Sequence, residues 1–221
     1  MQIAMFAQPD RIMPSNPNEI AIVHIIDDDE SLRLAVDSLL RSVGLQTRTY
    51  GAAREFLDAK RDDVPGCLVL DVRLPGISGL DFQEQLSSHG IHMPAVLVTG
   101  HGDIPMSVRA MKAGAVDFLP KPFRDQDMLD AVMGAIARDR KRRSSDGEAA
   151  EVRNRFATLS PRERQVMMLV TAGKMNKQVA GDLELSEITV KIHRGSAMRK
   201  MGARTLADLV RMADALKTAN E

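Results

Sequence analysis

Three carboxylates, a hydroxyl and an amine each lie at or just beyond the end of a short apolar run. Asp27 and Asp28 follow the run IAIVHII, and Asp71 follows CLVL. Thr99 follows PAVLV, and Lys121 comes shortly after AVDFL. Carboxylate oxygens are the ligands that Mg²⁺ prefers, and a lysine and a hydroxyl can each meet an oxygen of a phosphoryl group. These residue types could together accept a phosphoryl group, with Asp71 as the nucleophile.

The elements that must position these residues alternate between strand and helix. Apolar runs predict five strands, at 20–26, 45–50, 67–70, 94–98 and 115–119. Helical patterns lie between and after them, at 31–43, 51–60, 79–88, 103–113 and 125–140. Five strands that alternate with five helices predict an α/β fold with a parallel sheet covered on both faces.

Parallel sheets of this kind bind ligands beyond the carboxyl ends of their strands. The five polar residues should therefore converge on one rim, where a divalent cation would relieve the repulsion between the carboxylates. Each residue alone also has a structural explanation. The acidic run 27–30 suits a helix N-terminus, Asp71 a turn, Thr99 a strand end and Lys121 a solvated position. The five residues together follow the first, third, fourth and fifth predicted strands, and this combination favours a binding site over the separate structural explanations.

Composition and charge divide the 221-residue chain into two parts. Residues 18–140 hold 13 Lys/Arg and 19 Asp/Glu, whereas residues 158–221 hold 11 and 7, so different partners are expected for each part. The single Cys67 excludes an intrachain disulfide and fits a cytoplasmic protein. No apolar run approaches the ~18 residues of a membrane helix, so no membrane partner is expected. Residues 1–17 lack the features of a signal peptide and are interpreted as a flexible leader.

The second part of the chain is helical in pattern. Residues 141–157 are charged and poor in apolar side chains, which predicts a linker whose start could continue the preceding helix. The sequence LSPRER at 159–164 predicts a helix start, with Ser160 as N-cap and Glu163 completing a capping box. Three further helices are expected near 176–184, 187–201 and 205–217, with Asn176, Ser186 and Thr205 as candidate caps.

The helix predicted at 187–201 has two different faces. One face is apolar and suits a core: Val190, Ala197, Met198 and Met201. The opposite face carries Ile188, Ile192, Gly195, Ser196 and Arg199, flanked by Thr189, Lys191, His193, Arg194 and Lys200. Bare isoleucines could contact thymine methyl groups in a DNA major groove, and the flanking residues could contact phosphates. Periodicity alone slightly favours an ordinary helix with a solvated basic face.

Four motifs in residues 20–140 resemble the receiver domain of bacterial two-component response regulators, which has a flavodoxin-like five-stranded parallel sheet. They are IIDDDE, LVLDVRLPGISGLD, LVTGHGD and MKAGAVDFLPKPF. The resemblance implies that Asp71 is the phosphoacceptor, phosphorylated by a sensor histidine kinase. It also implies that Thr99 and Lys121 bind the phosphoryl oxygens, that Phe118 is the aromatic switch residue, and that the Lys121–Pro122 peptide is cis.

The same resemblance implies a bound Mg²⁺ or Mn²⁺ ion. Asp71 and Asp28 would bind it directly, Asp27 would bind it mainly through water, and the backbone carbonyl of Arg73 would be a further ligand.

Residues 159–210 resemble the all-α, four-helix LuxR/GerE-type helix-turn-helix domain. The resemblance makes 187–201 the recognition helix, with Lys191 and Ile192 at base-contacting positions. It places Thr189, His193 and Lys177 at backbone-contacting positions, and the helix geometry adds Arg194 and Arg199. Gly195 departs from the pattern, because related regulators often carry a larger, base-reading residue there.

The two resemblances together indicate a FixJ-type transcriptional activator that is not an enzyme in the turnover sense. Phosphorylation would favour a homodimer through helices 103–113 and 125–140, followed by binding to promoter DNA and action on RNA polymerase. Two other classes fit the sequence less well. A haloacid dehalogenase-type phosphatase would carry a second Asp at the position of Arg73. A LuxR-type sensor of small molecules would need an aromatic-lined apolar pocket, and only 3% of residues are aromatic.

Overall fold

The computed structural model describes residues 20–100 and 104–218, so the predicted leader at 1–17 lies outside the described residues. The chain forms two compact units, with the division after Lys141. Each unit is described by itself.

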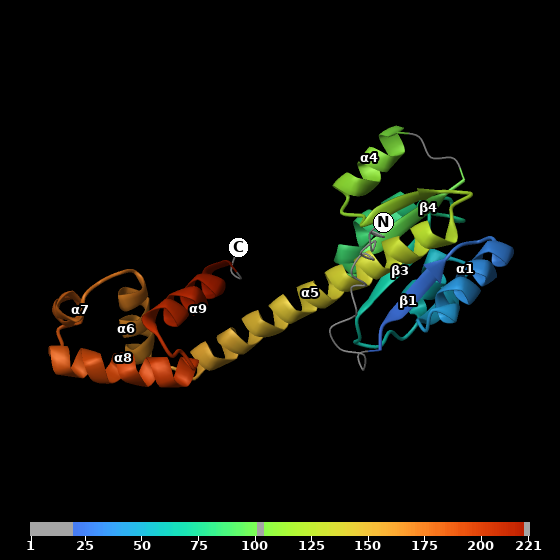
Figure 1. The fold of residues 1–221 in the computed structure, drawn as a ribbon. Coiled ribbons are helices and arrows are strands. Elements are labelled where there is room, and N and C mark those ends of the chain that lie inside the picture. Colours follow the sequence, from blue (N-terminus) through green and yellow to red (C-terminus); the bar gives the residue numbers. More distant parts are fainter. Residues whose placement is uncertain (1–19, 101–103, 219–221) are drawn as a thin grey trace, which may run out of the picture. The chain divides into compact units, whose positions relative to one another are not determined.

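The first unit contains a five-stranded, wholly parallel sheet with the order β2-β1-β3-β4-β5 (Figure 1). Its strands are β1 (Ile22–Ile26), β2 (Gln46–Tyr50), β3 (Gly66–Asp71), β4 (Ala95–Thr99) and β5 (Asp117–Pro120). The predicted strands are all present, with ends that differ by one or two residues. Every residue of β1, β3 and β4 is buried, as expected for central strands covered on both faces.

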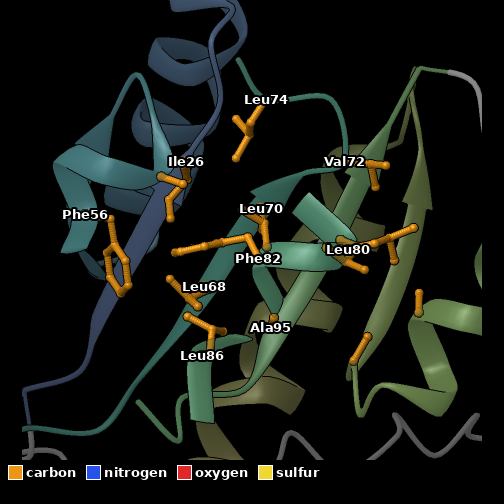
Figure 2. Packing of buried hydrophobic residues seen from close by; sticks show 14 of the residues in the cluster. Ile26, Phe56, Leu68, Leu70, Val72, Leu74, Leu80, Phe82, Leu86 and Ala95 are labelled. Carbon is orange, nitrogen blue, oxygen red and sulfur yellow. The ribbon is translucent and has the colours of Figure 1, made fainter. Parts of the chain in front are cut away.

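Helices cover both faces of this sheet. One face packs against α1 (Glu30–Ser42) and the first part of α5 (Asp125–Ala157) through Val36, Leu40, Met128 and Val132, among others. The other face packs against α2 (Ala53–Asp58), α3 (Gly79–Gln85), the 3₁₀ helix η1 (Leu86–His89) and α4 (Ile104–Lys112). In Figure 2, Phe82 of α3 lies over the sheet toward Phe56 of α2, and their ring centres are 6.1 Å apart.

Helix α5 ends later than the predicted residue 140 and includes residues 141–157, which the sequence predicted as a linker. The helix continues without a break to Ala157, so helix reaches far beyond the start of the predicted linker. Val152 and Phe156 pack against the core of the second unit, and Arg155 Nη1 donates a hydrogen bond to the Met201 carbonyl at 2.9 Å. These contacts hold the last two turns of α5 in a regular helix although apolar periodicity is absent before them.

The second unit is helical and has its own core. It contains α6 (Pro161–Thr171), α7 (Asn176–Leu183), α8 (Glu187–Met201) and α9 (Leu206–Thr218). Side chains that are fully buried at its centre include Val166, Met167, Val179, Val190, Ala197, Met201 and Leu209. Among the described residues, no helix of either unit has the length and apolar character needed to cross a membrane.

Three of the four predicted helix caps in this unit are confirmed. Ser160 and Glu163 form the capping box of α6, and Ser186 caps α8 through the Thr189 N–H. The Thr205 hydroxyl accepts a hydrogen bond from the Asp208 N–H at 3.1 Å. The prediction for Asn176 is wrong, because the N-cap of α7 is Met175.

Candidate phosphoacceptor site and DNA-binding helix

Asp71 is the last residue of β3 and is 6% exposed. The chain turns back sharply beyond it, because the Gly79 N–H that opens α3 donates to the Val72 carbonyl at 2.8 Å. A Cβ atom at position 79 would lie 2.1 Å from the Asp71 carbonyl oxygen. Only glycine allows α3 to begin this close to the strand, so the Gly-bearing loop after Asp71 shapes the rim beside the carboxylate.

Lys121 bridges the carboxylates of two neighbouring strands. Its Nζ atom lies 2.8 Å from Asp27 Oδ2, beyond β1, and 3.3 Å from Asp71 Oδ2, at the end of β3. Strand order reverses between β1 and β3, and open α/β sheets bind their ligands at such a switch point. The structure thus brings these three predicted residues together at the predicted rim.

Asp28 completes an acidic group with Asp27 and Asp71. One carboxylate oxygen from each of the three lies within 4.8 Å of the others, and Asp28 is exposed. The loop that carries Asp27 is held in place, because Asp27 Oδ1 accepts from the Asp29 N–H at 2.9 Å and Asp29 caps α1. An all-oxygen donor set of this size, open to solvent on one side, fits a hard cation that keeps several water ligands.

The Asp71 carboxyl has a raised pKa. Burial is the main cause, the charge of Asp27 adds to it, and Lys121 opposes it. A buried carboxylate beside another carboxylate is costly to ionise, and added positive charge would lower that cost. The electrostatics of the site therefore favour a bound cation.

Thr99 and Phe118 lie on β4 and β5, close to the same rim. Thr99 ends β4 and is fully buried, and the Lys121 N–H donates to its carbonyl oxygen at 2.6 Å. Phe118 is half-buried and packs against the core on the α4 side of the sheet. The Lys121–Pro122 peptide is cis, as the resemblance implied. The switching roles of Thr99 and Phe118 stay predictions, as does the role of the Arg73 carbonyl as a metal ligand.

Helix α8 has the two faces that its sequence predicts. Val190, Ala197 and Met201 are fully buried, whereas the side chains of Ile188 and Ile192 are 70% and 64% exposed. Two basic residues of α8, Lys191 and Arg199, are also exposed, and so is Lys177 of α7. Thr189, His193, Arg194 and Gly195 are partly buried.

Two residues of α8 form hydrogen bonds with Glu163 of α6. Ser196 Oγ donates to Glu163 Oε1 at 2.6 Å, and Lys200 Nζ lies 2.7 Å from Glu163 Oε2. These hydrogen bonds, led by that of Lys200, lower the pKa of Glu163 to about 2. Both side chains, which the sequence pattern places on or beside the outward face of α8, therefore have a partner within the unit.

Arg194 also has a partner within the unit, since its Nη1 atom lies 3.3 Å from the side-chain oxygen of Asn176. Asn176 therefore contacts α8 and does not cap its own helix. A helix projection shows which side of α8 is polar, but the location of Glu163 and Asn176 depends on how α6 and α7 pack on it.

Comparisons with known proteins identify a family for each of the two units. Residues 23–133 match the family "Response regulator receiver domain", and residues 157–213 match "Bacterial regulatory proteins, luxR family". Nodulation protein W of Bradyrhizobium diazoefficiens is 59% identical over 196 residues, which are 89% of this chain and 86% of that protein.

Two further relatives cover nearly the whole chain. The transcriptional regulatory protein FixJ of Azorhizobium caulinodans is 45% identical over 86% of this chain and 90% of that protein. The solved structure of the response regulator StyR has a TM-score of 0.77 and 45% identity, and the match covers 88% of this chain and 98% of that one. The chain therefore belongs to the FixJ-type two-component response regulators, in which a receiver domain is followed by a LuxR/GerE-type DNA-binding domain that regulates transcription.

Proposed function

We propose that Asp71 accepts a phosphoryl group from a phosphohistidine of a sensor histidine kinase. A carboxylate oxygen of Asp71 attacks phosphorus, the phosphorus–nitrogen bond breaks, and its electron pair returns to the imidazole ring of the kinase. The observation that carries this proposal is the position of Lys121 Nζ, 2.8 Å from Asp27 and 3.3 Å from Asp71. From there the amine can leave the carboxylates and meet an oxygen of the incoming phosphoryl group.

The remaining residues of the rim have supporting roles in this proposal. Asp28 and Asp71, with Asp27 through water and the Arg73 carbonyl, would hold Mg²⁺ or Mn²⁺, which neutralises charge on the carboxylates and the phosphoryl oxygens. The Thr99 hydroxyl would donate a hydrogen bond to a phosphoryl oxygen from the end of β4. The same residues would assist hydrolysis of the acyl phosphate, so the protein would limit the lifetime of its own signal.

We further propose that phosphorylation favours a homodimer through α4 and residues 125–140 of α5. An apolar stripe on α4 supports this choice, because Ile104, Val108 and Met111 are 80%, 46% and 49% exposed and follow one another at helical spacing. Thr99 and Phe118 lie on the two strands next to α4, so their rearrangement could change this surface.

The output would be DNA binding by α8. Lys191 and Ile192 would contact bases of promoter DNA, Lys177, Thr189, His193 and Arg194 would contact its backbone, and Arg199 would add a further contact. In this proposal residues 18–140 receive the signal, residues 158–221 bind DNA, and residues 141–157 link these two segments. The protein would then act on RNA polymerase in the cytoplasm, as an activator.

Labelling with acetyl phosphate carrying ³²P tests the phosphoacceptor proposal without a kinase. The wild-type chain should become labelled only with Mg²⁺ or Mn²⁺ present, and base treatment should remove the label, as for an acyl phosphate. Asp28→Asn should slow labelling strongly, and the matched change Asp58→Asn on the exposed face of α2 should leave it unchanged. Equal labelling of wild type in EDTA and in Mg²⁺ would contradict the proposal.

A further inference from the structure

Gly195 lies at the centre of the outward face of α8. Ile188, Ile192, Gly195 and Arg199 follow one another at intervals of four, three and four residues, which places them on one narrow stripe of the helix. The two isoleucines are largely exposed and Arg199 is exposed. The stripe therefore carries large side chains toward both ends and bare backbone in the middle.

The folded unit itself gives no reason for a glycine at this position. Gly195 lies inside a regular helix without a positive φ, and a Cβ atom built on it would have no heavy atom within 4 Å. Gly202 is different, because its φ is +74° and a Cβ there would approach the Arg155 side chain at 2.3 Å. A glycine in a helix interior destabilises the helix relative to alanine. If position 195 needs glycine, the need comes from a ligand.

We propose that Gly195 is the point at which the α8 backbone comes closest to DNA, and that its missing side chain sets how deeply the helix enters the major groove. This inference rests on the proposed DNA-binding role of α8. A helix with side chains is about 10–12 Å wide and the major groove is about 12 Å wide, so the central stripe limits the depth of entry.

The flanking residues explain why depth would matter. Ile192 and Arg199 lie about one turn to either side of Gly195, and a deep position brings both toward base edges. The exposed amine of Lys191 lies beside the stripe and suits the negative charge of a nucleic acid. Affinity for a preferred sequence should therefore depend on Gly195 much more than affinity for DNA in general.

The test uses the full chain and a duplex that the wild type selects from a random-sequence library, with and without acetyl phosphate and Mg²⁺. Binding to this selected duplex is compared with binding to a mixed-sequence duplex of equal length. G195A should weaken binding to the selected duplex by about tenfold or more, and G195L should weaken it further. Binding to the mixed-sequence duplex should change by less than about twofold, because phosphate contacts dominate it.

Stability measurements separate this effect from misfolding. G195A should raise the midpoint of thermal unfolding by about 2–6 °C, since alanine favours the helix and meets no neighbour. G147A is the matched control, because Gly147 is an exposed helical glycine of the same unit with open space around it. G147A should leave binding to both duplexes unchanged.

A further variant, K191A, separates failure of this inference from failure of the proposed DNA-binding face. If K191A weakens binding to the selected duplex while G195A binds it like the wild type, the role of Gly195 is overturned and the face stands. If neither variant changes binding, both ideas fail. If G195A weakened binding to both duplexes equally, the inference would also be overturned, because the contact would then carry no sequence preference.

Discussion

The Nζ atom of Lys121 lies 3.3 Å from Oδ2 of Asp71, although these residues come from the ends of β5 and β3, which are separated in the sheet by β4. The contact is possible because both residues lie at the carboxyl ends of parallel strands, where side chains can project over the rim. Lys121 also contacts Asp27, so a single amine partly neutralises two buried carboxylates. A metal ion would compete with this amine for the same oxygens.

Lys121→Gln is therefore predicted to tighten metal binding and to slow phosphorylation by acetyl phosphate. Loss of the amine should tighten Mn²⁺ or Mg²⁺ binding by about 1 kcal/mol, or roughly fivefold in dissociation constant. Labelling by acetyl phosphate should become slower, because the phosphoryl oxygens lose a cationic partner. Titration calorimetry and labelling rates check the two effects, with Lys60→Gln on the exposed surface as the control. Weaker metal binding by Lys121→Gln would contradict the shared position of the amine.

Arg109→Gln is predicted to loosen α4 from α3. Arg109 Nη2 lies 2.7 Å from Asp81 and 3.0 Å from Glu84, and Ala110 is the only residue of α4 that is fully buried. Amide hydrogen exchange of α4 should become faster in the variant, while global stability should change little because the ion pairs are exposed. Arg54→Gln, which removes an exposed pair within α2, should leave α4 unchanged. Unchanged exchange in α4 of Arg109→Gln would show that the ion pairs do not restrain it.

Two substitutions at the DNA-binding unit should have different signatures. Lys177→Ala should weaken binding to all sequences, if its amine meets one phosphate. It should also lower the salt slope, which is the slope of log affinity against log salt concentration, by about one unit.

Ile192→Ala should reduce the preference for the selected duplex and leave the salt slope unchanged, because the side chain is uncharged. Its thermal stability should stay near that of the wild type, since Ile192 is 64% exposed. Binding to selected and mixed duplexes across a salt series distinguishes these outcomes from a purely structural role.

The Glu163 network predicts a particular pH dependence of stability. Hydrogen bonds from Lys200, Ser196 and the Ser160 N–H hold the pKa of Glu163 at about 2, below its ordinary value of 4.5. A depressed pKa means that the stabilisation is complete above the ordinary value and is lost as pH falls toward 2. The difference in unfolding free energy between wild type and Glu163→Gln should therefore be large near pH 6 and should shrink steadily below about pH 4.5.

Denaturant unfolding of the full chain at a series of pH values measures this difference. Glu187→Gln removes an exposed carboxylate of α8 and serves as the control, for which a smaller and flatter difference is expected. A difference for Glu163→Gln that grows as pH falls would contradict a depressed pKa of Glu163 in the folded chain.

The first unit could be predicted closely from its sequence because its site depends on strand ends. An apolar run fixes where a buried strand stops, and parallel strands bring their carboxyl ends to one edge of the sheet. Asp27, Asp71, Thr99 and Lys121 could thus be placed near one another without knowledge of any contact. The sequence did not reveal that Lys121 binds both carboxylates, because that depends on side-chain conformation at the rim.

Other features could not be predicted because they depend on packing between elements. Residues 141–157 have the composition of a linker, and their helical state becomes understandable only when Phe156 and Arg155 are seen against the second unit. The contact between Lys200 and Glu163 likewise depends on how α6 packs against α8. A capping box identified Glu163 as a helix-start residue, but that motif uses only local hydrogen bonds.

Reduction of the phosphorylated chain with borohydride is the most direct test of the central claim. Borohydride converts an aspartyl phosphate to homoserine, and peptide mass spectrometry then identifies the position that was changed. After incubation with acetyl phosphate and Mg²⁺, homoserine is predicted at position 71, with Asp27 and Asp28 unchanged, and no conversion is predicted in Asp71→Asn. Homoserine at position 27 or 28 in the wild type, or undiminished phosphorylation of Asp71→Asn, would contradict the assignment of Asp71 as the phosphoacceptor.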